Sequence, residues 1–301
     1  MNSNVSLPIV SIVIPTYKNR GGLINSIESV LSQDYCGRLE VIVVDDNEPS
    51  SIERKNTMAL MQKYSTDIRV VYICHDKNKN GAAARNTGIK ASKGTFIAFL
   101  DDDDVFLSGK IVKQVNYLET YTEFDAVYCL ARRKKYGCSQ QVVKGNGTRE
   151  ILMLQSNFFT PTLMFRRESL LYINGFDEQF RRHQDYDLML RFFAAGYSIG
   201  CVQEVLVEIG INKGGNIPNS EELNQLKIFF FEVFQDFIDK EEQITPGFKN
   251  KVYAKHYAGV FLSCIKEKNF KMALKILRKY LPKSPSSFVG VVWKGFVAHL
   301  K

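Results

Sequence analysis

The sequence predicts an α/β fold with a largely parallel sheet, and two observations carry this prediction. Short apolar runs rich in branched and aromatic residues alternate with stretches whose apolar residues recur at helical spacing. Polar or acidic residues follow several of these runs directly. Alternating strands and helices are typical of parallel sheets, and open α/β sheets bind ligands beyond the carboxyl ends of their strands.

The predicted elements follow one another closely along the chain. The expected strands are residues 10–17, 39–44, 68–73, 96–100, 126–131 and 199–209. The expected helices are residues 23–31, 57–64, 81–92, a helix that opens with Asp185 and Asp187 in its first turn, and residues 221–240, 252–266 and 270–281. We therefore expect an α/β domain over residues 1–215 and a helical, basic extension over residues 216–301.

Composition and length limit the classes of protein to consider. The 301 residues allow one large domain, or one domain with an appendage, and 45% of them are hydrophobic. No stretch approaches the roughly 18 apolar residues of a membrane-spanning helix. The six cysteines form no CxxC pair, so neither a zinc cage nor a disulfide framework is expected. The polar N-terminus shows no signal-peptide pattern, so we expect a cytoplasmic protein.

The positive charge lies entirely in the last part of the chain. Residues 241–301 hold 12 Lys/Arg and 3 Asp/Glu, a net of +9, whereas residues 1–240 hold 28 and 29, a net of −1. This asymmetry predicts an anionic surface as partner of residues 241–301, and no nucleic acid. The apolar segment 288–300, with Trp293, fits the membrane interface. Its alternatives are a helical subdomain packed on the rest of the chain, or a dimer contact.

Four consecutive carboxylates follow the buried strand at residues 96–100. Asp101, Asp102, Asp103 and Asp104 repel one another, so a positive group is expected among them. Mn²⁺ or Mg²⁺ is the simplest candidate, because such an ion binds one or two carboxylates and completes its shell with substrate phosphates. The alternative is a solvated acidic turn.

Three further side chains lie next to successive strand–helix connections. Tyr17 can stack on a base, Asp46 can accept a hydrogen bond from a pyrimidine, and Arg85 can approach the base or the phosphates. Each has a structural alternative: a rim aromatic for Tyr17, a helix N-cap for Asp46 and an ion pair for Arg85. The sequence contains neither the G-x-G-x-x-G of a dinucleotide fold after its first strand nor a P-loop.

Four ordered segments resemble the motifs of family 2 glycosyltransferases: residues 11–19 (SIVIPTYKN), 40–46 (EVIVVDD), 80–88 (NGAAARNTG) and 99–104 (FLDDDD). The resemblance covers about residues 8–215 and implies the GT-A fold, with a nucleotide-sugar half over residues 1–104 and an acceptor half over 105–215. The residues it implies at the nucleotide sugar are Pro15, Thr16, Tyr17, Asp46, Arg85, Asp101 and Asp102. Asp103 is the implied metal ligand, and Asp102 with Asp104 is the alternative register.

The same resemblance implies a catalytic base on the acceptor side. Residues 183–191 (HQDYDLMLR) match the family's segment at Asp185, but Gln184 stands where the family usually has Glu. His183 is a rival base, and N-terminal capping is the structural alternative for Asp185 and Asp187. Asn212 and Lys213 stand where many members carry a His. Lys213 either neutralises a diphosphate or is a solvated loop residue.

The resemblance therefore implies an inverting, metal-dependent hexosyltransferase that uses Mn²⁺ or Mg²⁺. Its implied donor is a nucleotide sugar, expected to be a UDP-sugar, and its implied acceptor a lipid-linked saccharide in the synthesis of O-antigen or capsule. We expect it to be peripheral on the inner face of the plasma membrane. The alternatives are a sugar-nucleotide pyrophosphorylase, for which residues 20–22 (RGG) make a poor triphosphate loop, and a non-catalytic saccharide-binding protein.

Overall fold

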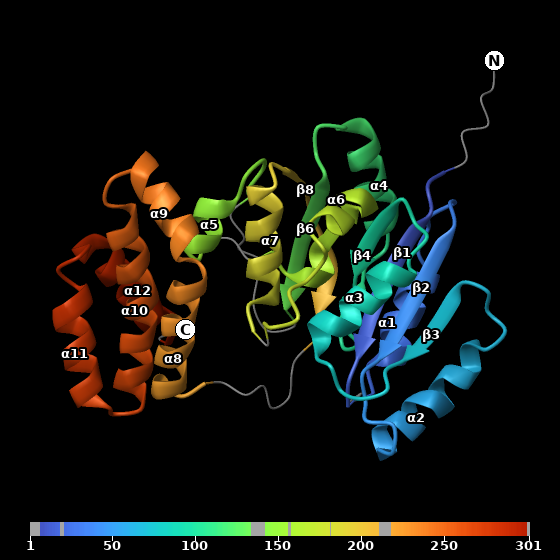
Figure 1. The fold of residues 1–301 in the computed structure, drawn as a ribbon, viewed down its shortest axis with the longest axis horizontal. Helices are drawn as coiled ribbons and strands as arrows, with labels where there is room; N and C mark the ends of the chain where they lie inside the picture. The colour runs from blue at the N-terminus through green and yellow to red at the C-terminus, as the bar shows by residue number, and fades with distance from the viewer. Residues whose placement is uncertain are drawn as a thin grey trace. The chain divides into compact units, whose positions relative to one another are not determined.

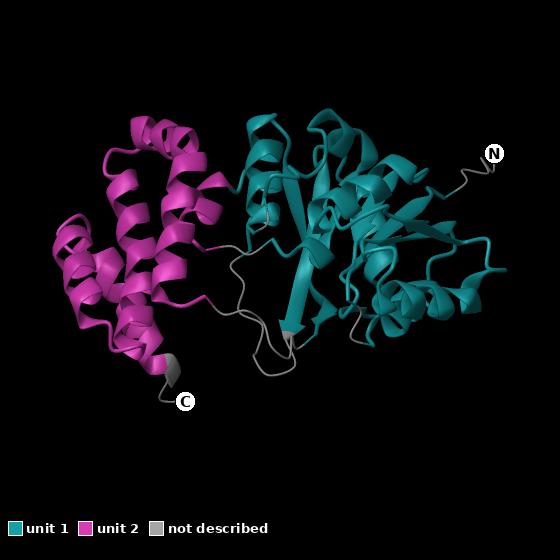
Figure 2. Cartoon of the chain, turned by 60° about the horizontal axis from the view of Figure 1, so that its bottom comes forward, with its two compact units in different colours: residues 1–147, 157–212 teal, residues 148–156, 213–301 magenta. Residues whose placement is uncertain are grey.

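The computed structural model describes residues 7–18, 21–133, 142–155, 158–180, 182–210 and 218–299. The chain divides into two compact units (Figure 2). Unit 1 comprises residues 1–147 and 157–212, and unit 2 comprises residues 148–156 and 213–301. Residues 148–156, which the sequence analysis placed in the first domain, thus group with the helices of unit 2.

Unit 1 is built on an eight-stranded sheet in the order β3-β2-β1-β4-β7-β6-β8-β5 (Figure 1). Its strands are β1 (Val10–Thr16), β2 (Leu39–Asp45), β3 (Val70–Cys74), β4 (Phe96–Phe99), β5 (Val105–Phe106), β6 (Ala126–Arg133), β7 (Leu163–Arg166) and β8 (Ile199–Ile209). β1, β2, β3 and β4 pair in parallel, as do β6 and β8, while β7 runs antiparallel to both β4 and β6. The predicted α/β fold with a mostly parallel sheet is therefore confirmed.

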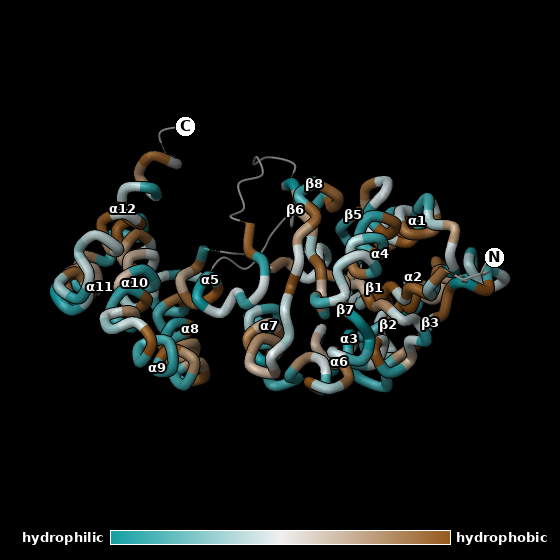
Figure 3. The backbone as a smooth tube through the Cα atoms, turned by 90° about the horizontal axis from the view of Figure 1, so that it is seen from above, coloured by the Kyte–Doolittle hydropathy of each residue, from teal (hydrophilic) through white to brown (hydrophobic). Residues whose placement is uncertain are grey.

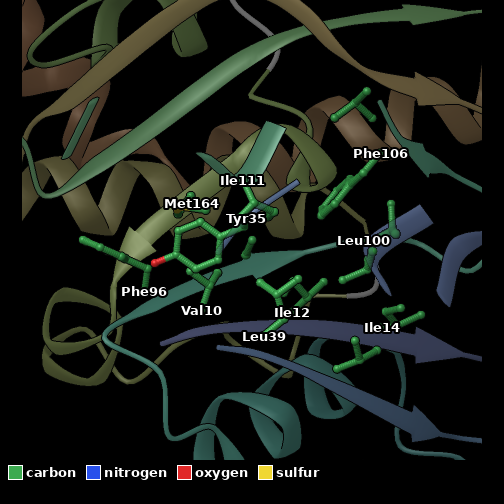
Figure 4. Packing of buried hydrophobic residues seen from close by; sticks show 14 of the residues in the cluster. Val10, Ile12, Ile14, Tyr35, Leu39, Phe96, Leu100, Phe106, Ile111 and Met164 are labelled. Carbon is green, nitrogen blue, oxygen red and sulfur yellow. The ribbon is translucent and has the colours of Figure 1, made fainter. Parts of the chain in front are cut away.

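Helices cover the sheet because successive strand residues point to opposite faces. The helical segments of unit 1 are α1 (Leu23–Leu31), α2 (Ile52–Met61), α3 (Gly81–Ala91), α4 (Lys110–Thr120), α6 (Arg167–Tyr172) and α7 (Gln184–Ala194), with short 3₁₀ turns at Gln62–Tyr64 and Thr160–Thr162. Val10, Ile12 and Ile14 enter one apolar core together with residues of α1 and α4 (Figure 4). Val13 points the other way and lies against Gly88 of α3, where a Cβ atom would approach it to 2.2 Å.

Unit 2 contains only helices among its described residues. They are α5 (Thr148–Leu152), α8 (Ser220–Val233), α9 (Gln235–Ile244), α10 (Phe248–Lys266), α11 (Phe270–Tyr280) and α12 (Pro285–His299). The helical extension expected after residue 216 is present. None of the described helices combines the length and hydrophobicity that a bilayer crossing requires.

Three helix predictions were wrong in their bounds, and the helix expected at 252–266 begins earlier, at Phe248. Residues 221–240 form two helices instead of one, because Phe234 leaves helical geometry with φ −100° and ψ 16°. Its ring is buried and lies edge-on to that of Phe230, one turn earlier, so the apolar spacing of 3.6 residues continues through the break and gives no sign of it. The helix expected at 57–64 begins at Ile52, because the hydroxyl of Ser51 caps it by accepting a hydrogen bond from the Arg54 N–H.

The parallel strands bring their carboxyl ends to one edge of the sheet. Thr16 pairs with Asp45 at the end of β1 and β2, and the N–H of Leu100, just after β4, donates to the carbonyl of Val13. Tyr17, Asp46 and Asp101 each follow one of these strands. The polar side chains singled out in the sequence therefore meet at one edge, as open α/β sheets require for ligand binding.

Candidate functional site

A cleft of about 490 Å³ opens at this edge of unit 1. It is lined by residues from the ends of β1 and β2, the loop before α3, the first turns of α3 and α7, and the loop after β4. These residues are Pro15, Thr16, Tyr17, Asp46, Asn78, Lys79, Asn80, Gly81, Ala84, Arg85, Asp101, Asp102, Asp103 and Gln184. Every residue predicted to bind the nucleotide sugar or the metal therefore lines one cleft, although they come from four separate parts of the chain.

The loop that carries Asp101–Asp104 is held rigidly against β1 and α1. The hydroxyl of Thr16 donates to Oδ2 of Asp102 at 2.6 Å. The hydroxyl of buried Ser26 lies 2.7 Å from the carbonyl oxygen of Asp104, to which it donates. At Gly22 a Cβ atom would lie 2.5 Å from the carbonyl oxygen of Asp102. Only glycine permits this approach, so Gly22 shapes the acidic loop, a role that its sequence neighbours did not indicate.

The four carboxylates do not all face the cleft. Asp104 is buried, lies outside the cleft lining, and accepts a hydrogen bond of 2.8 Å from the N–H of Gly210. Burial raises its pKa to about 8 and that of Asp102 to about 6, with the neighbouring acids adding to both shifts. Asp101 and Asp103 line the cleft. The alternative register, Asp102 with Asp104, would require Asp104 to line it, and Asp104 does not. The solvated acidic turn considered from the sequence does not fit a loop that includes a buried carboxyl group.

Asp46 organises one wall of the cleft. Its side chain is almost fully buried, and its two oxygens accept hydrogen bonds from the side chain of Asn78, the N–H groups of Lys79 and Asn80, and a ring nitrogen of His75 at 2.7 Å. The alternative role as helix N-cap was wrong, because Ser51 caps α2. The predicted contact of Asp46 with a base stays a prediction. The structure adds a second role, which is to fix the loop at 78–80.

Arg85 of α3 connects the acidic loop to α7. One terminal nitrogen donates to Oδ1 of Asp101 at 2.6 Å, and the other donates to Oε1 of Gln184 at 2.9 Å. The guanidinium group also lies 5.5 Å from the centroid of the Phe176 ring. The ion pair considered as the structural alternative is thus present, but it lies inside the cleft, where it brings a fixed positive charge to the acids.

Asp185 lies beside the cleft, one residue after Gln184 in the first turn of α7. Burial raises the pKa of its carboxyl group to about 6, and the charge of Arg85 opposes this shift while that of Asp101 adds to it. Its Oδ1 accepts a hydrogen bond of 3.0 Å from the N–H of Tyr186. A half-buried carboxylate with a pKa near 6 is largely ionised at neutral pH and is a better proton acceptor than an ordinary Asp.

The neighbours of Asp185 have other tasks. Asp187 pairs with Arg191, one helical turn along α7, and two guanidinium nitrogens donate to its Oδ2 at 2.7 and 2.9 Å, so it is structural. His183 occupies the N-cap position with a left-handed φ of 59° and stacks on the Tyr186 ring at 5.3 Å. The predicted roles of Asn212 and Lys213 fall outside the described residues.

The sequence analysis missed part of the cleft. Asn78, Lys79 and Asn80 were not chosen as site residues, although Asn80 opens the third motif and its side chain caps α3 by accepting from the N–H groups of Ala82 and Ala83. Asn followed by Gly at a helix start was the available signal. Lys79 brings a second cation to the cleft, and no pattern in the sequence indicated it.

The chemistry of the cleft fits a hard divalent cation. Within the described ranges, no group of three or more His, Cys, Asp or Glu side chains could hold a metal ion by protein ligands alone. Mg²⁺ and Mn²⁺ nevertheless bind at sites with one or two carboxylates when phosphate oxygens and water fill the other positions. Asp103 supplies such a carboxylate oxygen at the cleft, next to two more acids.

Comparison with known proteins connects this geometry to a family. The model of the family described as glycosyl transferase family 2 matches residues 11–187. An uncharacterized glycosyltransferase of Rickettsia prowazekii is 29% identical over 261 residues, which cover 81% of this chain and 77% of the relative. The UDP-Glc:alpha-D-GlcNAc-diphosphoundecaprenol beta-1,3-glucosyltransferase WfaP of Escherichia coli is 35% identical over 118 residues, 39% of this chain and 44% of WfaP.

Solved structures agree with this assignment at the level of the fold. Crystal structures of S. aureus TarS 1-349 in complex with UDP and with UDP-GlcNAc match with a TM-score of 0.64. The match covers 94% of this chain and 83% of TarS 1-349, at 18% and 17% sequence identity. The eight-stranded sheet, its helices and these neighbours identify the fold as α/β of the GT-A type.

Proposed function

Because the chain belongs to glycosyl transferase family 2, we propose that it transfers a sugar from a UDP-sugar to a hydroxyl group of a saccharide acceptor, with inversion at the anomeric carbon. One observation carries the proposal. A single cleft gathers an exposed aromatic ring, two cations and four carboxylates, and a carboxylate with a raised pKa lies beside it. These are the groups needed to bind a base, a diphosphate and a metal ion, and to accept a proton.

The donor is bound by the β1 end of the cleft. Tyr17 exposes 46% of its surface, so its ring is available to stack on a nucleobase. Asp46 and the loop it holds form the adjacent wall. Arg85 and Lys79 both line this cleft and supply positive charge near the diphosphate, with the Lys79 ammonium paired to Asp76 at 2.7 Å. The TarS structures support a uridine donor, because their titles record complexes with UDP and UDP-GlcNAc.

Asp103 would hold a divalent metal ion, with Asp101 and Asp102 beside it in the cleft lining. Thr16 fixes Asp102 by a hydrogen bond, and Arg85 fixes Asp101. The chemistry that a bound Mn²⁺ or Mg²⁺ ion supplies here is Lewis-acid stabilisation of the leaving diphosphate. The cations of the chain and the rigid acidic loop hold the reacting groups in line, which lowers the entropic part of the barrier.

Asp185 acts as the general base. As the acceptor oxygen attacks the anomeric carbon, its proton passes to the Asp185 carboxylate. The bond from the anomeric carbon to the diphosphate oxygen breaks, and UDP leaves with the electron pair. No enzyme nucleophile takes part in this scheme, so one displacement inverts the configuration. The pKa of about 6 keeps Asp185 ionised at neutral pH and makes it a stronger base than an unperturbed Asp.

The acceptor is a lipid-linked saccharide in the synthesis of a surface polysaccharide such as O-antigen or capsule. WfaP supports this proposal, because its name specifies a GlcNAc-diphosphoundecaprenol acceptor. We propose further that residues 241–301 bind an anionic membrane surface and make the protein peripheral on the inner face of the plasma membrane. Their net charge of +9 supports this, as does Trp293, which exposes 69% of its surface on α12.

Two measurements test the proposal. UDP and Mn²⁺ together should raise the melting temperature by more than the sum of their separate effects, because the diphosphate completes the metal site. A panel of UDP-sugars should then release UDP only when a GlcNAc- or GalNAc-diphosphate-lipid analogue is present. Cooperative binding without turnover of any donor would favour a saccharide-binding protein on this fold. Formation of UDP-sugar from UTP and a sugar phosphate would favour a pyrophosphorylase.

A further inference from the structure

A groove of about 460 Å³ lies within unit 2, between α8, α10 and α11. Its floor is apolar and buried, formed by Tyr257, Ile276 and Tyr280, and the two tyrosine rings stack at 3.7 Å with an interplanar angle of 6°. Ile228 and Met272 form apolar walls. The groove is separate from the donor cleft, since all of its lining belongs to the helical unit.

Three lysines line one side of this groove. Lys271, Lys275 and Lys279 are exposed on α11 and follow one another at four-residue spacing, so they stand one above the other along the helix. Among the residues that the structure describes, no carboxylate lies within 4.0 Å of any of these three ammonium groups. Glu221 is the only acid in the lining. The groove therefore has an excess of positive charge that its own walls do not balance.

An exposed apolar stripe runs beside the lysines on the same helix. Phe270 and Leu274, one turn apart, expose 63% and 46% of their surfaces, and each directly precedes a lysine of the groove. The alternation of hydrophilic and hydrophobic residues along α11 can be followed in Figure 3. A soluble anion bound by the lysines would leave Phe270 and Leu274 exposed to water. A lipid surface satisfies both features, because it offers phosphate to the lysines and acyl chains to the apolar side chains.

We propose that this groove binds the phosphate headgroup of an anionic membrane phospholipid, with Phe270 and Leu274 entering the acyl boundary. The inference deepens the proposed function, since it rests on the membrane partner proposed for residues 241–301. The earlier proposal assigned membrane binding to the net charge of residues 241–301 as a whole, whereas this one assigns it to a single groove. The row of lysines along one side of the groove contacts the phosphate oxygens, and the apolar floor receives the first carbons of the chains.

The test compares two variants of the full chain that lose equal charge. The groove variant removes the three lysines that line the groove: Lys271→Gln/Lys275→Gln/Lys279→Gln. The control variant removes three exposed lysines of unit 2 that do not line it: Lys251→Gln/Lys266→Gln/Lys268→Gln. Binding is measured by sedimentation with vesicles of phosphatidylcholine, with and without phosphatidylglycerol. We expect the groove variant to lose affinity for the anionic vesicles by about a hundredfold, or about fivefold per lysine, and the control variant by about tenfold or less.

Three outcomes would overturn the proposal. Equal losses in both variants would mean that only net charge matters. No loss in the groove variant would place the lipid contact elsewhere, on α12 for example. Release of the protein from vesicles by millimolar inorganic phosphate alone would identify a free-phosphate site. UDP release with a water-soluble acceptor analogue serves as an independent readout. This activity should be unchanged in both variants. If the wild-type protein also fails to release UDP, the proposed glycosyl transfer is wrong, and that result is independent of whether the groove binds lipid.

Discussion

Arg85 donates a hydrogen bond of 2.6 Å to Oδ1 of Asp101, which joins α3 to the acidic loop that follows β4. The same guanidinium group reaches Gln184, the residue before Asp185. One side chain thus sets the distance between the donor-binding loop and the proposed base. Lysine cannot replace it, because a single ammonium group lacks the planar fork that spans two partners.

Arg85→Lys is therefore expected to lower kcat/KM for sugar transfer by about 10- to 100-fold, the effect of losing one or two charge-assisted hydrogen bonds. Arg85→Gln should lower it further, because the charge is lost as well. Steady-state UDP release measures both. A kcat/KM for Arg85→Lys equal to that of wild type would show that the bridge between Asp101 and Gln184 has no part in transfer.

The pKa of Asp185 predicts the acidic limit of activity. Since the base must be deprotonated and its pKa is raised to about 6, kcat/KM should fall as the pH drops through about 6 and level off above it. In Gln184→Glu the added carboxylate disfavours the charged form of Asp185. The fall in kcat/KM at low pH, the acidic limb of the pH profile, should therefore move to higher pH. Gln184→Met, which adds no charge, is the control and should leave the limb in place. A limb that moves equally in both variants would assign it to another group.

The register of the acidic loop can be tested by two neutral, nearly isosteric changes. Asp103→Asn should reduce transfer by at least about 100-fold and weaken the response to Mn²⁺, because it removes the proposed metal ligand. Asp104→Asn should retain most activity, since the amide oxygen still accepts the hydrogen bond from Gly210. The opposite ranking, with Asp104→Asn the more damaging, would establish the Asp102/Asp104 register instead.

Tyr17 and Asp46 should respond differently to substitution, although both line the donor cleft. Tyr17→Ala is expected to weaken UDP binding by about 10- to 100-fold through loss of stacking, with an unchanged melting temperature, because the ring is exposed. Asp46→Ala should lower both the affinity for UDP and the melting temperature, because four hydrogen bonds to residues 75–80 are lost and the buried His75 ring loses this partner. Calorimetric titration and thermal unfolding separate the two cases. A melting temperature unaltered by Asp46→Ala would contradict its role in shaping the loop.

Gly22→Ala should disturb the acidic loop from a distance in sequence. The new methyl group meets the backbone of Asp102 at 2.5 Å, so we expect a loss of about 1–3 kcal/mol in the free energy of unfolding and weaker binding of UDP with Mn²⁺. Gly259→Ala on α10 is the matched control, since no atom lies within 4 Å of the position its Cβ would occupy. Wild-type stability in Gly22→Ala would show that the loop moves freely away from α1.

Much of the site followed from the sequence because parallel strands end at a common edge. Apolar runs placed β1, β2 and β4, and the polar residues after them had to meet. What depends on distant contacts could not be found in this way. The approach of Gly22 to Asp102 joins residues 80 positions apart, and the contribution of Lys79 depends on a loop that Asp46 folds. The break at Phe234 was also missed, because the helical spacing of apolar residues continues on both sides of it.

The strand order was also beyond sequence patterns. β7 lies between β4 and β6 and runs antiparallel to both, which links the parallel strands β1 to β4 to the pair β6 and β8. Residues 163–166 were not among the strands expected from the apolar runs, and a sequence pattern gives neither the direction of a strand nor its neighbours. The assignment of Asp185 as base came from the family resemblance, and the structure adds that burial raises its pKa.

Acceptor-dependent release of UDP by the wild-type protein and by Asp185→Asn tests the central claim most directly. The variant is nearly isosteric but cannot accept a proton. We predict that the wild type releases UDP from one UDP-sugar only when the lipid-diphosphate acceptor is present, and that Asp185→Asn loses this activity by at least about 100-fold while binding UDP and Mn²⁺ normally. Unchanged release by Asp185→Asn would contradict the account and make His183 the first alternative base.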